Sequence, residues 1–318
     1  MRKPDPAPGA ESDPLVAALA AQQPDLALRE RFLDLPGVRL HVVEAGPAEG
    51  RPVLLLHGFP EFWWGWRRQI AALVDAGRRV VIPDLRGYNR SGKPKGLRAY
   101  GLDALTDDLS GLMDDLGSAP VDVVAHDWGG AVAWWGTLRF PERFARLVIL
   151  NVPHPSVMRR FLRTNRAQRR RSRYLFYFQL PFFPERKLRA GDFQPFRSIF
   201  RRTSRKGTFS AGDLDTYAAA AAQPGAITAM LNWYRAALWY PPQRPTQRIV
   251  EPSVHLLWGE DDVALGADMA RASMPLCRDG RLTFIPHAGH WVQHEAAERV
   301  NELILATLQA PADRADER

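Results

Sequence analysis

Apolar and polar positions follow two alternating patterns in the first half of this 318-residue chain. Short apolar runs, rich in β-branched residues, predict buried strands, and longer stretches with apolar residues three or four apart predict amphipathic helices. The predicted strands are 38–46, 51–58, 78–85, 121–126 and 145–152, and the predicted helices are 63–77, 102–117 and 128–139. Apolar strands separated by amphipathic helices favour a mostly parallel sheet with helices on both faces.

This alternation stops near Pro153 and resumes near Val250. The residues between them are rich in Arg, Phe, Tyr and Ala and predict helices and loops. Strands at 253–259 and 281–286 and helices at 266–274 and 296–309 then complete the pattern, so one α/β sheet carries a helical insertion. The expected divisions are a flexible N-terminal segment (1–30), an α/β core (31–153 and 249–310), a helical cap (154–248) and a flexible tail (311–318).

Charge adds one unusual feature. The formal net charge is +8, and the stretch 159–173 holds eight arginines. Such a stretch could be a patch for nucleic acid or acidic membrane, or the solvated face of helices. We favour the solvated face, because no aromatic or glycine pattern accompanies the arginines, and we expect no nucleic-acid partner. The role of the stretch stays open.

Cysteine content and the N-terminal sequence bear on the compartment. Cys277 is the one cysteine, so no intramolecular disulfide can form and a reducing compartment is expected. The N-terminus lacks the apolar stretch of an export signal, and no apolar run reaches the ~20 residues that span a bilayer. These features predict a cytoplasmic protein without a membrane span, either a monomer or a homodimer.

The stretch VDVVAHDWGG (121–130) places a carboxylate, Asp127, where a buried strand meets a helix. Asp is a common N-cap, so an ordinary capping role is one interpretation. The other is a nucleophile on a strained strand-to-helix turn, like a G-x-S-x-G elbow with Asp in place of Ser. The bend alone does not decide between them.

A nucleophilic carboxylate would form an ester, whose hydrolysis needs a base, an acid that orients the base, and oxyanion donors. HAGHW supplies His290 after the last strand, and GEDD supplies Asp262 after the preceding one, in the order expected of an α/β-hydrolase. His287, His294, Glu260 and Asp261 are competing candidates. The histidine spacing lacks a recognised zinc pattern, so we expect no metal and no organic cofactor.

Several motifs together resemble those of α/β-hydrolase-fold epoxide hydrolases, over residues 31–310. The matching segments are HGFPEFWWGWR (57–67), PDLRGYNRSGKP (83–94), HDWGG (126–130), LLWGEDD (256–262) and AGHWVQHE (288–295). The resemblance implies that Asp127 is the nucleophile, His290 the base and Asp262 its acid. It also implies that the backbone N–H groups of Phe59 and Trp128 hold the oxyanion. Trp128, Trp63 and Phe59 are expected to help form an apolar pocket.

The helical insertion resembles the cap of the same enzymes. YLFYFQLPFFPE aligns Tyr174 with one catalytic tyrosine, with Tyr177 as the fallback, and MLNWYRAAL aligns Tyr234 with the second. Without the resemblance, core packing would be the better explanation of these tyrosines. Opening an epoxide releases a basic alkoxide, and a protonated tyrosine can supply the proton.

The expected activity is hydrolysis of a small apolar epoxide by water to a vicinal diol. Haloalkane and haloacid dehalogenases use the same Asp-His-Asp machinery and are the first alternative. Fluoroacetate-type dehalogenases carry an arginine after the nucleophile, and Trp128 at that position counts against an acid substrate. A non-enzymatic binding protein on the same fold is the second alternative.

Overall fold

An eight-stranded sheet forms the centre of the molecule in the computed structural model, which describes residues 12–243 and 247–310. The strand order is β1-β2-β4-β3-β5-β6-β7-β8. Strand β2 pairs antiparallel with β1 and β4, and all other neighbours pair parallel. The strands are β1 (Arg29–Leu35), β2 (Val38–Ala45), β3 (Pro52–Leu56), β4 (Arg79–Pro83), β5 (Val121–His126), β6 (Phe144–Leu150), β7 (Ser253–Gly259) and β8 (Gly280–Ile285).

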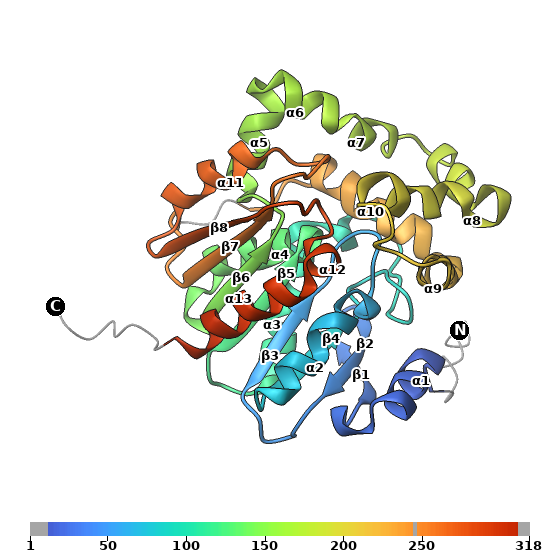
Figure 1. Cartoon of the computed structure of the whole chain (residues 1–318). Coiled ribbons are helices and arrows are strands. Elements are labelled where there is room, and N and C mark those ends of the chain that lie inside the picture. The colour runs from blue at the N-terminus through green and yellow to red at the C-terminus, as the bar shows by residue number, and fades with distance from the viewer. Residues whose placement is uncertain (1–11, 244–246, 311–318) are drawn as a thin grey trace.

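Helices cover both faces of this sheet. Figure 1 shows α2 and α13 in front of the strands and α3 and α4 behind them. The core helices are α1 (Pro14–Gln22), α2 (Arg67–Asp75), α3 (Leu102–Leu116), α4 (Asp127–Arg139), α11 (Ala267–Ser273), α12 (Val292–Glu295) and α13 (Ala297–Gln309). The predicted mostly parallel sheet between two helical layers is therefore confirmed.

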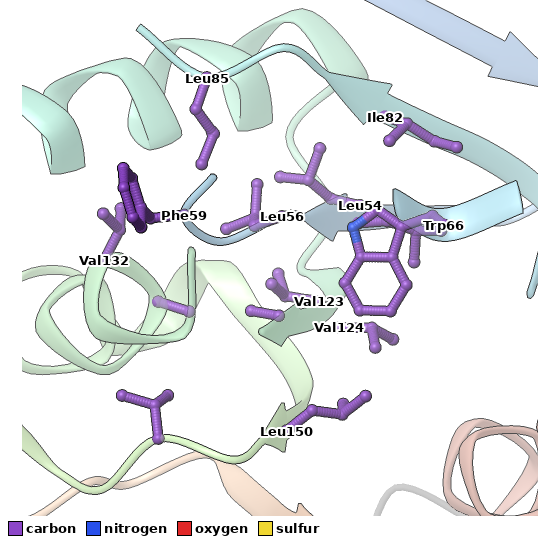
Figure 2. Packing of buried hydrophobic residues seen from close by; sticks show 14 of the residues in the cluster. Leu54, Leu56, Phe59, Trp66, Ile82, Leu85, Val123, Val124, Val132 and Leu150 are labelled. Atoms are coloured by element: carbon purple, nitrogen blue, oxygen red, sulfur yellow. The ribbon is translucent and has the colours of Figure 1, made fainter. Parts of the chain in front are cut away.

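The central strands are apolar on both faces because both faces are covered. Leu54 and Leu56 of β3 and Val123 and Val124 of β5 are fully buried, and Figure 2 shows them packed with side chains from neighbouring strands and helices. Burying one such side chain stabilises the fold by roughly 1.5–3 kcal/mol. This rigid centre fixes the positions of the loops at the strand ends.

A helical cap is inserted between β6 and β7 and lies across one end of the sheet (Figure 1). It consists of α5 (Pro155–Thr164), α6 (Arg166–Arg171), α7 (Arg173–Tyr177), α8 (Phe183–Thr203), α9 (Ala211–Ala222) and α10 (Ala226–Trp239). The backbone of α8 leaves helical geometry from Ala190 to Phe193. The predicted helical insertion is thus present.

The N-terminal part of the described chain is more ordered than its sequence suggests. Residues 12–30 belong to the segment expected to be flexible, yet α1 buries Val16 and Leu19, and Asp13 accepts a hydrogen bond from the Leu15 N–H. Strand β1, which begins at Arg29, was not predicted. Its charged residues obscure the apolar pattern in the sequence. In the structure its arginines are neutralised by Glu44 of the neighbouring strand β2. Residues 1–11 and the tail 311–318 lie outside the described residues.

Within the described ranges, the structure contains no helix that is both long enough and apolar enough to cross a membrane.

Candidate active site

Asp127 lies on a strained turn between β5 and α4. Its φ of 46° is in the left-handed region, which costs a non-glycine residue energy and persists only where the surroundings enforce it. Small neighbours make the turn possible: a Cβ on Gly129 would lie 2.4 Å from the Leu56 carbonyl oxygen, and one on Gly58 would lie 2.4 Å from the Asp127 Cβ. The helix cap position is occupied by His126. This geometry favours the elbow interpretation over simple capping.

The Asp127 carboxylate faces a backbone donor from another loop. The Phe59 N–H, just after β3, donates to Asp127 Oδ1 over 2.8 Å. Trp128 is the second residue of α4, so its N–H belongs to the first turn, whose amides have no acceptor within the helix. These two amides come from the positions expected for an oxyanion site.

His290 links Asp127 to Asp262. Its Nε2 lies 3.8 Å from Asp127 Oδ2, and its Nδ1 lies 2.9 Å from Asp262 Oδ2. Asp262 is buried, and its Oδ1 accepts hydrogen bonds from the N–H groups of Ala264 and Leu265. The three side chains come from the ends of β5, β7 and β8, which the parallel sheet brings to one edge.

Charge at this site favours a protonated His290. Burial alone would lower the pKa of the imidazole, but the charge and hydrogen bond of Asp262, and to a smaller extent the charge of Asp127, raise it to about 9. Burial also opposes ionisation of Asp262, yet His290 and the hydrogen bonds to Asn151 and Leu265 hold the pKa of Asp262 below its usual value. His290 and Asp262 therefore behave as a coupled ion pair.

Asn151 completes this arrangement and was missed in the sequence. Its Nδ2 donates to Asp262 Oδ2 over 2.8 Å, while its Oδ1 accepts from the Gly259 N–H over 2.9 Å. Asn151 follows β6 directly and has a φ of 46°. An Asn at the end of a buried strand was the available signal.

The two predicted cap tyrosines lie together above the core site. Their rings are 6.0 Å apart between centroids, and the Tyr234 ring is 5.1 Å from both Phe59 and Trp128. Burial raises the pKa of Tyr174 and Tyr234, and the charge of Asp127 raises both further. Both phenols are therefore protonated at neutral pH. Tyr177, the alternative candidate for the first cap tyrosine, is exposed, and its ring contacts Phe178.

Trp63 lies elsewhere. It is fully buried, its backbone N–H donates to Asp84, and its indole N–H donates to Asp13 before α1. In the described part of the chain, its ring contacts are with Phe62 and Trp64. Trp63 thus holds the N-terminal segment against the core, and these contacts do not bring it to Asp127.

A buried polar network around Glu61 connects the site to the cap. Glu61 accepts hydrogen bonds from Tyr217 of α9 (2.6 Å) and Gln293 (2.9 Å), and its Oε1 lies 2.7 Å from His294 Nε2. Burial opposes its ionisation, but His294 and His126 hold the pKa of Glu61 well below its ordinary value. His294 is thereby engaged with Glu61, whereas the competing candidate His287 is exposed.

One cluster in the described residues has the spacing of a cation site: ligand atoms of Asp13, Glu30 and His41 lie within 4.8 Å of one another. Their atoms already have partners. Both ring nitrogens of His41 lie 2.8 Å from carboxylates, one of Asp84 and one of Glu30. The cluster therefore serves as an internal hydrogen-bond network.

Comparisons with known proteins show which proteins this chain resembles in sequence and fold. The family model described as alpha/beta hydrolase fold matches residues 51–297. The chain is 42% identical to the AB hydrolase superfamily protein YfhM of Bacillus subtilis, covering 88% of this chain and 97% of that protein. It is 36% identical to Epoxide hydrolase 4 of Homo sapiens, covering 88% and 78%. A crystal structure of a Bacillus megaterium epoxide hydrolase with an inhibitor superposes with a TM-score of 0.80 at 28% identity, covering 88% of this chain and all of that one.

Proposed function

Because this chain belongs to the epoxide hydrolase family of the α/β-hydrolase fold, we propose that it hydrolyses epoxides to vicinal diols through a covalent ester on Asp127. The observation that carries the proposal is the pair of cap tyrosines, Tyr174 and Tyr234, which pack together close enough to Asp127 for its charge to raise the pKa of both phenols. A halide leaving group needs no such acids, whereas an epoxide oxygen does.

In the first step, Asp127 Oδ2 forms a bond to an epoxide carbon as the ring C–O bond breaks. The electron pair moves to the ring oxygen, which takes a proton from Tyr174 or Tyr234. Asp127 Oδ1 remains as the ester carbonyl oxygen, beside the Phe59 N–H that contacts it at 2.8 Å. The aromatic side chains of Phe59 and Trp128 pack against Tyr234 beside the ring-opening site.

In the second step, His290 Nε2 removes a proton from water, and the hydroxide attacks the ester carbonyl. The N–H groups of Phe59 and Trp128 stabilise the oxyanion, where loss of one such donor typically costs ~10²–10³ in rate. Collapse of the tetrahedral intermediate releases the diol oxygen, which takes the proton from His290, and leaves Asp127 as a carboxylic acid. Asp127 then gives its proton to His290, which restores both the carboxylate and the protonated imidazole that begins the cycle.

Proton supply links the two steps. His290, with a pKa of about 9, begins the cycle protonated at neutral pH. Ring opening removes the negative charge of Asp127 and creates a tyrosinate. The tyrosinate is a stronger base than the His290 imidazole, because burial and nearby charge raise the pKa of both tyrosines above the ordinary 10. It therefore takes the proton from His290, which becomes a base when the ester is ready for hydrolysis.

The test is to incubate the protein with aryl and alkyl epoxides, haloalkanes and haloacids and to assay diol and halide together, with Asp127→Ala as the blank. We expect diol without halide, and an enzyme adduct with the mass of the epoxide. Halide without diol would assign the site to dehalogenation and remove the acid role from the tyrosines. No adduct and no product from any substrate would favour a binding protein.

A further inference from the structure

The outer face of the cap carries large apolar side chains in solvent. Phe182 is 83% exposed and Trp239 66% exposed. We define the apolar cap patch as Phe176, Leu180, Phe182, Phe183, Leu238 and Trp239, all of which are exposed. Scattered apolar residues are common on protein surfaces, but contiguous large ones mark a surface that contacts another apolar phase.

The two segments of the patch, 176–183 and 238–239, are joined in space. Phe182 and Trp239 both line a cavity of about 810 Å³ on the cap. Arg235 of α10 fixes the first segment by donating to the carbonyls of Phe178 and Leu180. The patch is therefore one surface held by buried hydrogen bonds, and it lies on the outer side of the segment that carries Tyr174.

Arginines border this surface. Arg186 and Arg189 line the same cavity as Phe182 and Trp239, and both are exposed. No carboxylate of the described residues forms an ion pair with either; Glu185 beside them is paired with the buried Arg235 over 2.6 Å. The patch thus combines apolar side chains with unneutralised positive charge.

The charge of the first part of the cap, from α5 to the end of α8, has the same sign. Residues 155–207 contain sixteen lysines and arginines and only two acids, Glu185 and Asp192. This segment therefore carries more positive charge than the entire chain, whose net charge is +8, and the remainder is net negative. Of the described cations in the segment, only Arg197 forms an ion pair with a carboxylate. The positive field is concentrated on the cap.

We propose that the apolar cap patch docks on an anionic lipid bilayer, with Phe182, Phe183 and Trp239 entering the interface and Arg186 and Arg189 at the headgroups. Aromatic and leucine side chains beside cations are the composition that binds such interfaces. The proposal concerns Arg186 and Arg189, while the solvated-face interpretation of the arginines in 159–173 stays a prediction. A nucleic acid would account for the charge but would leave Leu180 and Leu238 without an apolar environment. The proposal is independent of the hydrolytic activity.

Vesicle sedimentation of the full-length protein tests this docking. We expect binding to phosphatidylcholine vesicles that contain phosphatidylglycerol, little binding to phosphatidylcholine alone, and release as salt is raised. Replacing Arg186 and Arg189 with Ser should weaken partitioning about thirtyfold, since each cation near an anionic surface contributes about as much as a fivefold change. The control exchanges Arg278 and Arg299, both paired with carboxylates in other parts of the molecule, for Ser and should bind as wild type.

Tryptophan emission tests whether the apolar side chains enter the interface. On anionic vesicles the emission should move to shorter wavelength, and Trp239→Phe should lose this shift while still binding. Phe182→Ser with Phe183→Ser should weaken binding, with circular dichroism showing that each variant is folded.

Three results would overturn the proposal. Equal vesicle binding by wild type and by the variant with Phe182→Ser and Phe183→Ser would leave charge alone as the cause of binding. Binding to duplex DNA without binding to vesicles would assign the surface to nucleic acid. A dimer that the same phenylalanine substitutions convert to monomer would assign the patch to a second copy of this chain.

Discussion

Asp262→Asn is the substitution for which the structure makes the sharpest prediction. Asp262 Oδ2 receives hydrogen bonds from His290 and Asn151, and Oδ1 receives two from the N–H groups of Ala264 and Leu265. An amide has the same shape but only one acceptor oxygen. In either orientation its NH₂ group therefore faces two donors. His290 loses the negative charge in both, and it also loses the hydrogen bond that orients its ring when the NH₂ group faces Nδ1.

The magnitude follows from the His290 pKa. With Asp262 in place it is about 9; without that charge, burial should bring it below the ordinary value of 6.5. A fall in this pKa from about 9 to 6.5 corresponds to roughly 3.4 kcal/mol of lost stabilisation of the imidazolium. The imidazolium forms when water is activated, so this loss alone should slow ester hydrolysis by about 10²–10³. A wrong imidazole tautomer would add to it, as in a triad whose orienting Asp becomes Asn, where the loss is about 10⁴. Ring opening depends on Asp127 and the tyrosines and should change far less.

Rapid-quench kinetics combined with intact mass spectrometry would separate the two steps. The variant should show a burst of one adduct per protein molecule followed by slow release of diol, whereas wild type should show little adduct at steady state. A variant that turns over within tenfold of wild type, or that slows without accumulating adduct, would refute the assignment of Asp262 to the hydrolytic step. Circular dichroism would show whether the variant is folded.

Three other predictions test neighbouring parts of the site. Tyr174→Phe and Tyr234→Phe should each slow adduct formation by about 10² and together by more, while Tyr177→Phe serves as the exposed control; equal effects at all three positions would contradict the acid role. Asn151→Ala should lower the free energy of unfolding in urea by about 2–3 kcal/mol, because a buried carboxylate loses a donor; an unchanged midpoint would contradict this. Ester hydrolysis should accelerate as pH rises and level off with a midpoint below about 9, because His290 acts only unprotonated and esterification removes one of the charges that raise its pKa; a rate that falls over this range would contradict the base assignment.

Periodicity in the sequence was sufficient to predict the central strands, most of the covering helices and the inserted cap. Each central strand is buried on both faces, and covering helices such as α2 and α13 are buried on one. Periodicity failed at β1 and α1. Strand β1 is an edge strand, and its arginines are neutralised by Glu44 from the neighbouring strand. α1 buries only Val16 and Leu19 among its nine residues. Local pattern cannot reveal charges or contacts that are supplied from elsewhere in the chain.

For the candidate site, the sequence supplied the chemical groups and their order: a carboxylate at an elbow, then an acid and a histidine after later strands. Only the tertiary structure decided which groups meet. Asp262 is buried beside His290, whereas its neighbours Glu260 and Asp261 are exposed. His294 contacts Glu61. Trp63 donates to Asp13 in the N-terminal segment. The physical reason is that burial, hydrogen-bond partners and pKa depend on segments more than a hundred residues apart, which become neighbours only when the sheet and cap assemble.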